Sequence, residues 1–176
     1  MERGIGDDYI GWMKPICFLT ALIALTLVTG GCSKGPATAA KPDFTAQLTG
    51  AGQVPPVSTT ASGAASFWIS ADGLELRFQL SVTALNNVTM AHLHLGALGE
   101  NGPPVVWLYP SAPPPKEIAG ASNGVLAEGV IKADNLSGSL AGKTVGDLVA
   151  AIKAHGIYVN VHTQDHADGE IRGQLQ

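Results

Sequence analysis

The strongest constraint on the fold is a nine-residue run, Leu74 to Val82, in which apolar and polar side chains alternate. Successive side chains of a β-strand point to opposite faces, so the alternation predicts a strand with one face in the core and one in water. The Ala71-Asp72-Gly73 sequence directly before the run favours a hairpin turn.

Several shorter stretches show the same period of two. Phe44, Ala46 and Leu48 alternate with polar residues, and Phe67 and Ile69 share one face of their segment. Further strands are expected at 63–71, 88–95, 104–109, 125–133, 157–163 and 169–176. With 22 glycines and 11 prolines available for turns, these segments predict an all-β chain folded as an antiparallel sandwich or barrel.

One segment breaks this pattern and predicts a short helix over 144–155. Its apolar residues are spaced i, i+3, i+4 and i+7, which places them on one helix face: Val145, Leu148, Val149 and Ile152. Thr144 can cap the first turn, Asp147 suits the positive end of the helix, and Gly156 can end it. The expected fold class is therefore mainly β with one amphipathic helix.

The segment before these strands has the features of an export signal. Residues 16–29 form an apolar run of 14 residues, which is too short to span a bilayer comfortably and is typical of a signal peptide. Two glycines and Cys32 follow, as at the cleavage site of bacterial lipoproteins, where the cysteine becomes the acylated first residue. We therefore expect a signal peptide over 1–32 with cleavage before Cys32, a flexible tether over 33–42 and a domain over 43–176.

Details of this leader leave alternatives open. Glu2, Asp7 and Asp8 do not suit the positively charged start of a signal peptide, whereas Lys14 follows Met13 directly, so translation is expected to start at Met13. A threonine stands where lipoprotein sites usually carry leucine, so an ordinary secretory cleavage site and a retained membrane anchor remain alternatives. The expected location is the periplasm or the cell surface, with the lipid in a bacterial membrane such as the cell outer membrane.

Composition excludes several classes of function. Charged residues make up only 14% of the chain and form no cluster of lysine and arginine, so nucleic-acid binding is not expected. Both cysteines, Cys17 and Cys32, belong to the leader, which leaves the folded part without a disulfide or a catalytic thiol. The sequence contains no nucleophile elbow, phosphate-binding loop or dinucleotide fingerprint, so it predicts no catalytic residues.

The residues that point to chemistry are histidines on expected strands. His92 and His94 share the polar face of one strand, with their Cα atoms about 6.5–7 Å apart. His162 lies on the polar face of 157–163, and neutral imidazoles are common ligands of copper and zinc. If these strands are neighbours, the histidines predict a metal site; alternatively they are structural and hydrogen-bond nearby turns. Other polar residues expected on these faces are Tyr158, Asn160, Glu170 and Arg172.

Three separated blocks of the sequence resemble the CHRD (chordin-type) domain: 44–70, 91–106 and 158–175. The resemblance covers about 43–176, essentially the whole expected domain. It implies an immunoglobulin-like β-barrel with faint similarity to copper/zinc superoxide dismutase. The family occurs in chordin, an extracellular antagonist of bone morphogenetic proteins, and in many bacterial exported proteins, and it implies no single activity.

The likeness to the dismutase is local. His92 and His94, followed by Gly96 and Asn101, resemble its copper-binding strand, and His162 can stand for another copper ligand. The sequence lacks a convincing zinc loop and the cysteine pair of that enzyme family. These departures argue against a complete dismutase site.

Three functions therefore remain open for the domain. The first is a lipid-anchored binding or structural module without enzymatic activity, and the second is a copper- or zinc-binding protein. The third is a dismutase-like redox enzyme. The sequence identifies no protein partner and no small ligand beyond the membrane that would hold the lipid.

Overall fold

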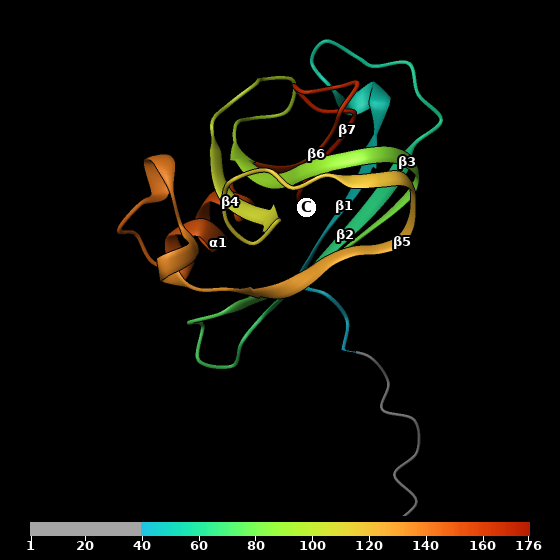
Figure 1. The fold of residues 1–176 in the computed structure, drawn as a ribbon. Coiled ribbons are helices and arrows are strands. Elements are labelled where there is room, and N and C mark those ends of the chain that lie inside the picture. The colour runs from blue at the N-terminus through green and yellow to red at the C-terminus, as the bar shows by residue number, and fades with distance from the viewer. Residues whose placement is uncertain (1–39) are drawn as a thin grey trace, which may run out of the picture. The chain divides into compact units, whose positions relative to one another are not determined.

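The alternating run opens the longest strand of the domain, β3 (Leu76–Leu95), in a computed structural model that describes residues 40–176 (Figure 1). The expected signal peptide, Cys32 and most of the tether lie outside the described residues. The expected hairpin turn is present, since the amide of Gly73 donates to the carbonyl of Ser70 at 2.9 Å. The strand begins later than expected, and Leu74 is 67% exposed instead of facing the core.

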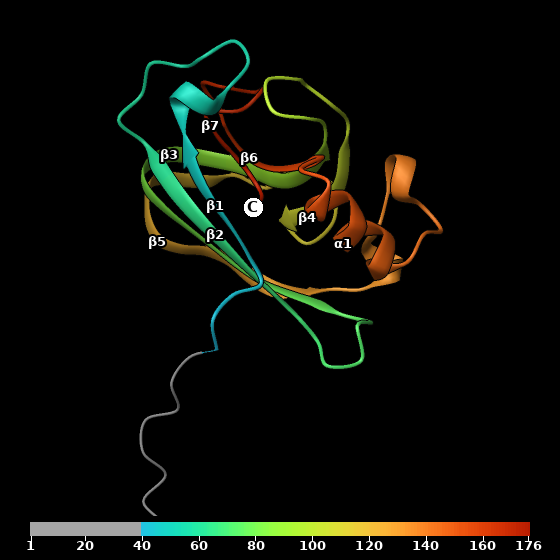
Figure 2. The ribbon, with the colours of Figure 1, turned by 180° about the vertical axis from the view of Figure 1, so that it is seen from behind.

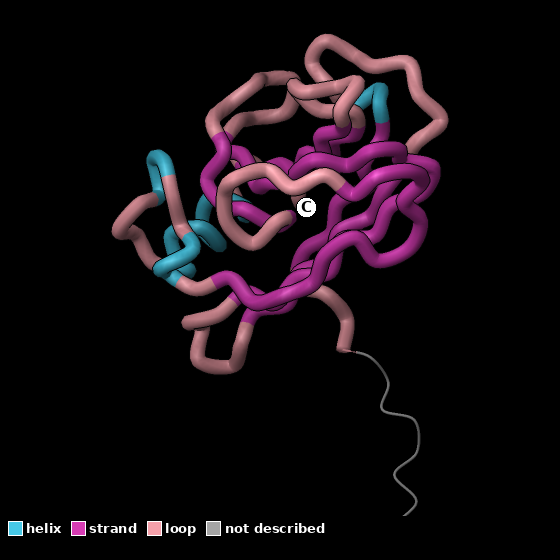
Figure 3. The backbone as a smooth tube through the Cα atoms, in the orientation of Figure 1, coloured by secondary structure: helices cyan, strands magenta, loops and turns pink. Residues whose placement is uncertain are grey.

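Strands are the predominant secondary structure of the described chain, as the sequence predicts (Figure 3). The other strands are β1 (Phe44–Thr49), β2 (Ser62–Ile69), β4 (Pro104–Tyr109), β5 (Ile118–Ile131), β6 (Ile157–Thr163) and β7 (Ile171–Gln174). Short 3-10 helices span Gly50–Gly52, Ala133–Asn135 and Gly138–Leu140. β5 starts well before the strand expected at 125–133, and β7 is shorter than the expected 169–176.

The sheet closes on itself as an antiparallel barrel. Its strands follow the order β2-β1-β7-β6-β3-β4, and β2 also pairs with β3, which completes a ring of β3, β2, β1, β7 and β6. The first half of β3 pairs with β2 and β5, and its second half pairs with β6 and β4. One long strand therefore contributes to both sides of the barrel, and the expected antiparallel fold is confirmed.

The two halves of β3 are joined by irregular backbone. Separate strands were expected at 74–82 and 88–95, but the structure continues pairing through the residues between them. Ala84 and Asn87 take positive φ angles of 57° and 50°. The register with β5 shifts at each of these two residues. Such bulges bend a strand without ending it, which is how β3 turns from one side of the barrel to the other.

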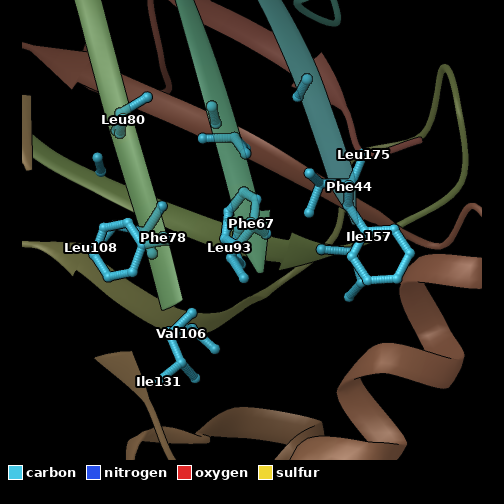
Figure 4. Packing of buried hydrophobic residues seen from close by; sticks show 14 of the residues in the cluster. Phe44, Phe67, Phe78, Leu80, Leu93, Val106, Leu108, Ile131, Ile157 and Leu175 are labelled. Carbon is cyan, nitrogen blue, oxygen red and sulfur yellow. The ribbon is translucent and has the colours of Figure 1, made fainter. Parts of the chain in front are cut away.

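The core of the barrel consists of the apolar faces of these strands. Phe67 and Phe78 are cross-strand partners whose ring centroids lie 6.1 Å apart, and Figure 4 shows them packed close to Leu93 and Val106. Their burial follows directly from the alternation, since every second residue of β1, β2 and the first half of β3 points inward.

The helix forms where the sequence predicts it, as α1 (Val145–Lys153), beside β4 (Figures 1 and 2). Thr144 and Asp147 form a capping box, in which each side chain accepts a hydrogen bond from the other's backbone amide. The helix ends before the expected 155, because His155 takes a positive φ of 54°. Within residues 40–176, no helix is long and apolar enough to cross a membrane.

The polar faces of β6, β7 and the second half of β3 depart most from expectation. The alternating pattern predicts that these faces lie in water. Instead every residue of β6 is buried, and Arg172 of β7 is only 2% exposed. The domain therefore has an apolar interior and a second, polar layer that is buried outside the barrel wall.

Candidate metal centre

Three loops cover the polar layer. They connect β1 to β2 (50–61), β3 to β4 (96–103) and β6 to β7 (164–170), and all three lie at the same end of the domain in both views (Figures 1 and 2). The side chain of Asn101 donates to the carbonyl of Val54 at 2.7 Å, so the first two loops are joined directly.

Hydrogen bonds between buried side chains connect these loops to the strands and to one another. Asn160 accepts a hydrogen bond from Nε2 of Gln53 at 2.6 Å. The carboxylate of Glu170 accepts from the hydroxyls of Thr59 at 2.7 Å and Thr163 at 2.8 Å. Each of these bonds joins residues far apart in the sequence or on different elements, so the loops and strands stabilise each other's positions.

The three histidines meet beneath this cover. His92 and His94 come from β3, His162 comes from its neighbour β6, and one ring nitrogen of each lies within 4.8 Å of the others. The shortest separation, between Nδ1 of His92 and Nε2 of His162, is 3.3 Å. The side chains of His92, His94 and His162 are 3%, 8% and 5% exposed, so water solvates none of them fully.

Backbone carbonyls set the proton positions on two of the rings. Nδ1 of His94 lies 2.9 Å from the oxygen of Gly102, and Nδ1 of His162 lies 2.8 Å from the oxygen of Ala167. A carbonyl only accepts hydrogen bonds, so each Nδ1 carries the proton and each Nε2 has a free lone pair. Ligand histidines in proteins are oriented in the same way.

Two buried nitrogens of the cluster have no hydrogen-bond partner within residues 40–176. They are Nε2 of His92 and Nε2 of His94. The lone pair on Nε2 of His162 accepts from Nδ1 of His92 in the neutral state, which leaves nothing to donate to His94. A buried polar atom without a partner costs about 1–3 kcal/mol, so the cluster is poorly satisfied as it stands.

Aromatic rings form the walls of the cluster. Trp107 of β4 meets His92 edge to face, with ring centroids 4.2 Å apart at 87°. Tyr158 of β6 stacks on His94 at 4.9 Å and 17°. The guanidinium carbon of Arg172 lies 3.4 Å from the centroid of the Tyr158 ring. Because β6 lies between β3 and β7, the tyrosine separates the arginine from the histidine.

Arg172 also holds the loop that covers the cluster. Its Nη1 donates to Oδ1 of Asn101 at 3.0 Å, and its Nη2 donates to the carbonyls of Glu100 at 2.7 Å and Ala97 at 3.3 Å. Among the residues that the structure describes, Arg172 forms hydrogen bonds to uncharged oxygens only.

The environment keeps all three imidazoles neutral. Burial lowers the pKa of His92 to about 3, with further lowering by His162 and His94. Burial also lowers the pKa of His94 to about 4, against the opposing effect of the hydrogen bond to Gly102. The pKa of His162 is lowered by burial as well. Neutral imidazoles have the lone pairs that metal binding needs.

The remaining sequence candidates and one missed residue complete the site. Tyr158, Asn160, Glu170 and Arg172 lie next to the cluster or under its loops, where they support it instead of contributing to the group of ligand atoms. Trp107 was missed, although 104–109 was expected to form a strand. Its place beside His92 depends on the register of β4 on β3, which no local pattern in the sequence reveals.

Fold and site together define a closed β-barrel domain with a buried three-histidine cluster under its loops. The CHRD domain model matches residues 44–175, and the chain belongs to this family. No curated protein and no solved structure matches the chain. Membership supports a binding or structural module, and the dismutase-like alternative stays a prediction.

Proposed function

We propose that the domain is an exported binding module in which His92, His94 and His162 hold one transition-metal ion, copper or zinc. The observation that carries this proposal is the buried Nε2 of His94, a lone pair with no donor, close to two more imidazole nitrogens. A purely structural histidine cluster would be expected to satisfy its buried polar atoms.

The spacing of the nitrogens fits coordination. Two nitrogens bound at 2.0–2.1 Å in tetrahedral geometry lie about 3.3 Å apart. Nδ1 of His92 and Nε2 of His162 have this separation. When Nδ1 of His92 binds, its proton moves to Nε2 of the same ring, which is the other neutral tautomer. Three protein nitrogens leave a fourth position, at which a bound ion can take an outside ligand.

Metal titration tests this function. We expect the chelator-stripped protein to bind one ion, with a change in Trp107 fluorescence because that ring touches His92. His94→Ala and His162→Ala should weaken binding by more than the about 10–100-fold that loss of a supporting residue costs.

The matched control is His155→Asn, which replaces an exposed histidine at a positive φ that asparagine tolerates. This variant should bind metal as the unaltered protein does. Absence of one-to-one binding by the unaltered protein, or equal affinity in the His94 and His162 variants, would contradict the proposal.

We also propose that a lipid on Cys32 holds the domain to a bacterial membrane, at the periplasm or the cell surface. The supporting pattern is the short apolar run followed by two glycines and the cysteine. Labelled fatty acid should be incorporated by the unaltered protein and by Cys17→Ser, but not by Cys32→Ser. Incorporation by Cys32→Ser would show that the lipid is attached elsewhere.

A further inference from the structure

The charged side chains near the histidine cluster affect which metal ions it can bind. Within residues 40–176, the group of potential ligand atoms contains three histidines and no carboxylate. Glu170 is the one buried acid in the described part of the chain, and its two oxygens accept hydrogen bonds from Thr59 and Thr163. The negative charge of Asp168 acts to raise the pKa of His162. Asp168 is exposed, however, so water screens this charge.

A buried positive charge lies on the other side of the cluster. Arg172 is 2% exposed, and its hydrogen bonds go to the uncharged oxygens of Ala97, Glu100 and Asn101. Only the ring of Tyr158 separates its guanidinium from His94. Its charge opposes any added positive charge on His94. An ion bound there therefore meets repulsion in a region of low dielectric, where such repulsion is strongest.

These observations favour the ion of lowest charge. We propose, on the basis of the metal-binding function above, that the site selects monovalent copper, Cu(I), over Cu(II) and Zn(II). Three neutral imidazoles contribute no negative charge to balance that of the ion, and burying an unbalanced charge is costly. The free-energy cost of burial rises with the charge of the ion. Repulsion from the positive charge of Arg172 increases the difference in this cost between a monovalent and a divalent ion.

The ligand set and its walls suit the same ion. Imidazole nitrogen is a good ligand for copper, and Cu(I), with a filled d shell, imposes little geometric preference and accepts three ligands. The rings of Trp107 and Tyr158 surround His92 and His94 with weakly polar surface. A divalent ion would need an anion in the fourth position, such as hydroxide from a deprotonated water, to lower its charge.

The reduction potential of bound copper tests this selectivity. The ratio of the affinities for Cu(I) and Cu(II) sets the difference between the potentials of bound and free copper, about 59 mV for each factor of ten. We expect a potential above that of the aqueous couple, and anaerobic competition with a Cu(I) chelator should show Cu(I) bound at least tenfold more tightly than Zn(II).

The outcomes separate this inference from the function on which it rests. A potential at or below the aqueous couple, or Zn(II) bound within tenfold of Cu(I), would overturn the selectivity while leaving a metal site in place. Failure to bind any of the three ions would overturn the metal-binding function itself.

Variants of Arg172 test the contribution of its charge. Arg172→Met removes the positive charge and should lower the reduction potential of bound copper. Arg172→Lys keeps a positive charge, so its potential should stay close to that of the unaltered protein. Equal potentials in the unaltered protein and Arg172→Met, or equal lowering in both variants, would show that the charge does not contribute. Circular dichroism of each variant confirms that it is folded, and if Arg172→Met does not fold, the potential of Arg172→Lys against Arg172→Gln gives the comparison.

Discussion

At the scale of the residue, single backbone atoms of the covering loops set the orientation of two of the histidine rings. The carbonyls of Gly102 and Ala167 fix the rings of His94 and His162. Both carbonyls belong to turns that depend on glycine or on buried side chains. Small changes in these turns should therefore alter the geometry of the histidine cluster.

The proton positions on these rings give the first prediction. In the metal-free protein at neutral pH, His94 and His162 should both be neutral with the proton on Nδ1, because a carbonyl accepts from that atom. Long-range proton–nitrogen NMR spectra distinguish the two tautomers directly. An Nε2-protonated His94 would contradict the orientation described for the site.

Gly169 gives the second prediction. Its φ is +121°, and an added Cβ would lie 2.3 Å from Oδ1 of Asn160 and 2.6 Å from Nε2 of Gln53. Gly169→Ala should therefore destabilise the domain by about 1–3 kcal/mol through backbone strain. The clash with Asn160 and Gln53 should add to this loss. The substitution should also weaken metal binding, because the loop that carries Ala167 must shift.

The control for this change is Gly99→Ala. Gly99 also has a positive φ, +83°, but nothing lies within 4 Å of its added Cβ. Chemical denaturation should show a loss of only about 1–2 kcal/mol for this variant. Equal losses for the two variants would mean that the contact with Asn160 and Gln53 has no part in the effect.

At the scale of the element, β6 is the most completely buried strand of the described domain. It pairs with β3 on one side and β7 on the other, and it is buried at all of its positions. By contrast, β5 pairs only with β3 within the described residues, and most of its side chains are exposed. Stability within one domain follows such differences in packing.

Hydrogen exchange should reveal this contrast. Amides of β6 should exchange only on global unfolding, because both faces and both edges of the strand are covered. Amides near Gly120 and Gly124 of β5, where the φ angles are 80° and 93°, should exchange orders of magnitude faster. Mass spectrometry of peptides from the two strands in one sample makes the comparison. Similar rates would show that β6 can open locally.

At the scale of the whole molecule, the domain buries polar groups in a second layer outside its apolar core. That layer contains His92 and His94, whose charged forms are disfavoured by burial. Groups kept neutral by burial bind fewer protons in the folded state than in the unfolded chain. Folding stability therefore depends on pH through this layer.

The metal-free protein should lose stability as the pH falls. The pKa values of His92 and His94 are about 3 and 4 in the folded protein, against 6.5 for an unperturbed histidine. The unfolded chain therefore takes up protons first, below pH 6.5. Each histidine should lower the free energy of unfolding by up to about 1.4 kcal/mol per pH unit between pH 6.5 and its folded pKa.

Denaturant titrations of the metal-free protein between pH 8 and pH 4.5 measure this dependence. Full stability should be present above pH 6.5, and His94→Asn should reduce the slope below that value because one titrating group is gone. A stability that rises as the pH falls would contradict the burial of neutral histidines.

Much of the fold could be predicted because its signals are local. The alternation between Leu76 and Val82 gives a half-buried strand, and the apolar spacing with the Thr144 cap gives α1 within two residues. The bend of β3 could not be predicted, since a bulge at Ala84 and Asn87 has no strong local pattern. Local preferences decide elements, whereas pairing partners and bulges depend on contacts made only in the complete sheet.

The candidate site divides in the same way. The sequence by itself determined which side chains share a face, because the period of a strand places His92 beside His94 whatever the rest of the chain does. Only the tertiary structure decided that this face is buried, that His162 joins it and that Trp107 lines it. These depend on strand register and on loop contacts such as Gln53 with Asn160, which join residues more than a hundred positions apart. Alternation distinguishes the two faces of a strand, but what covers each face is decided by the packing of the whole domain.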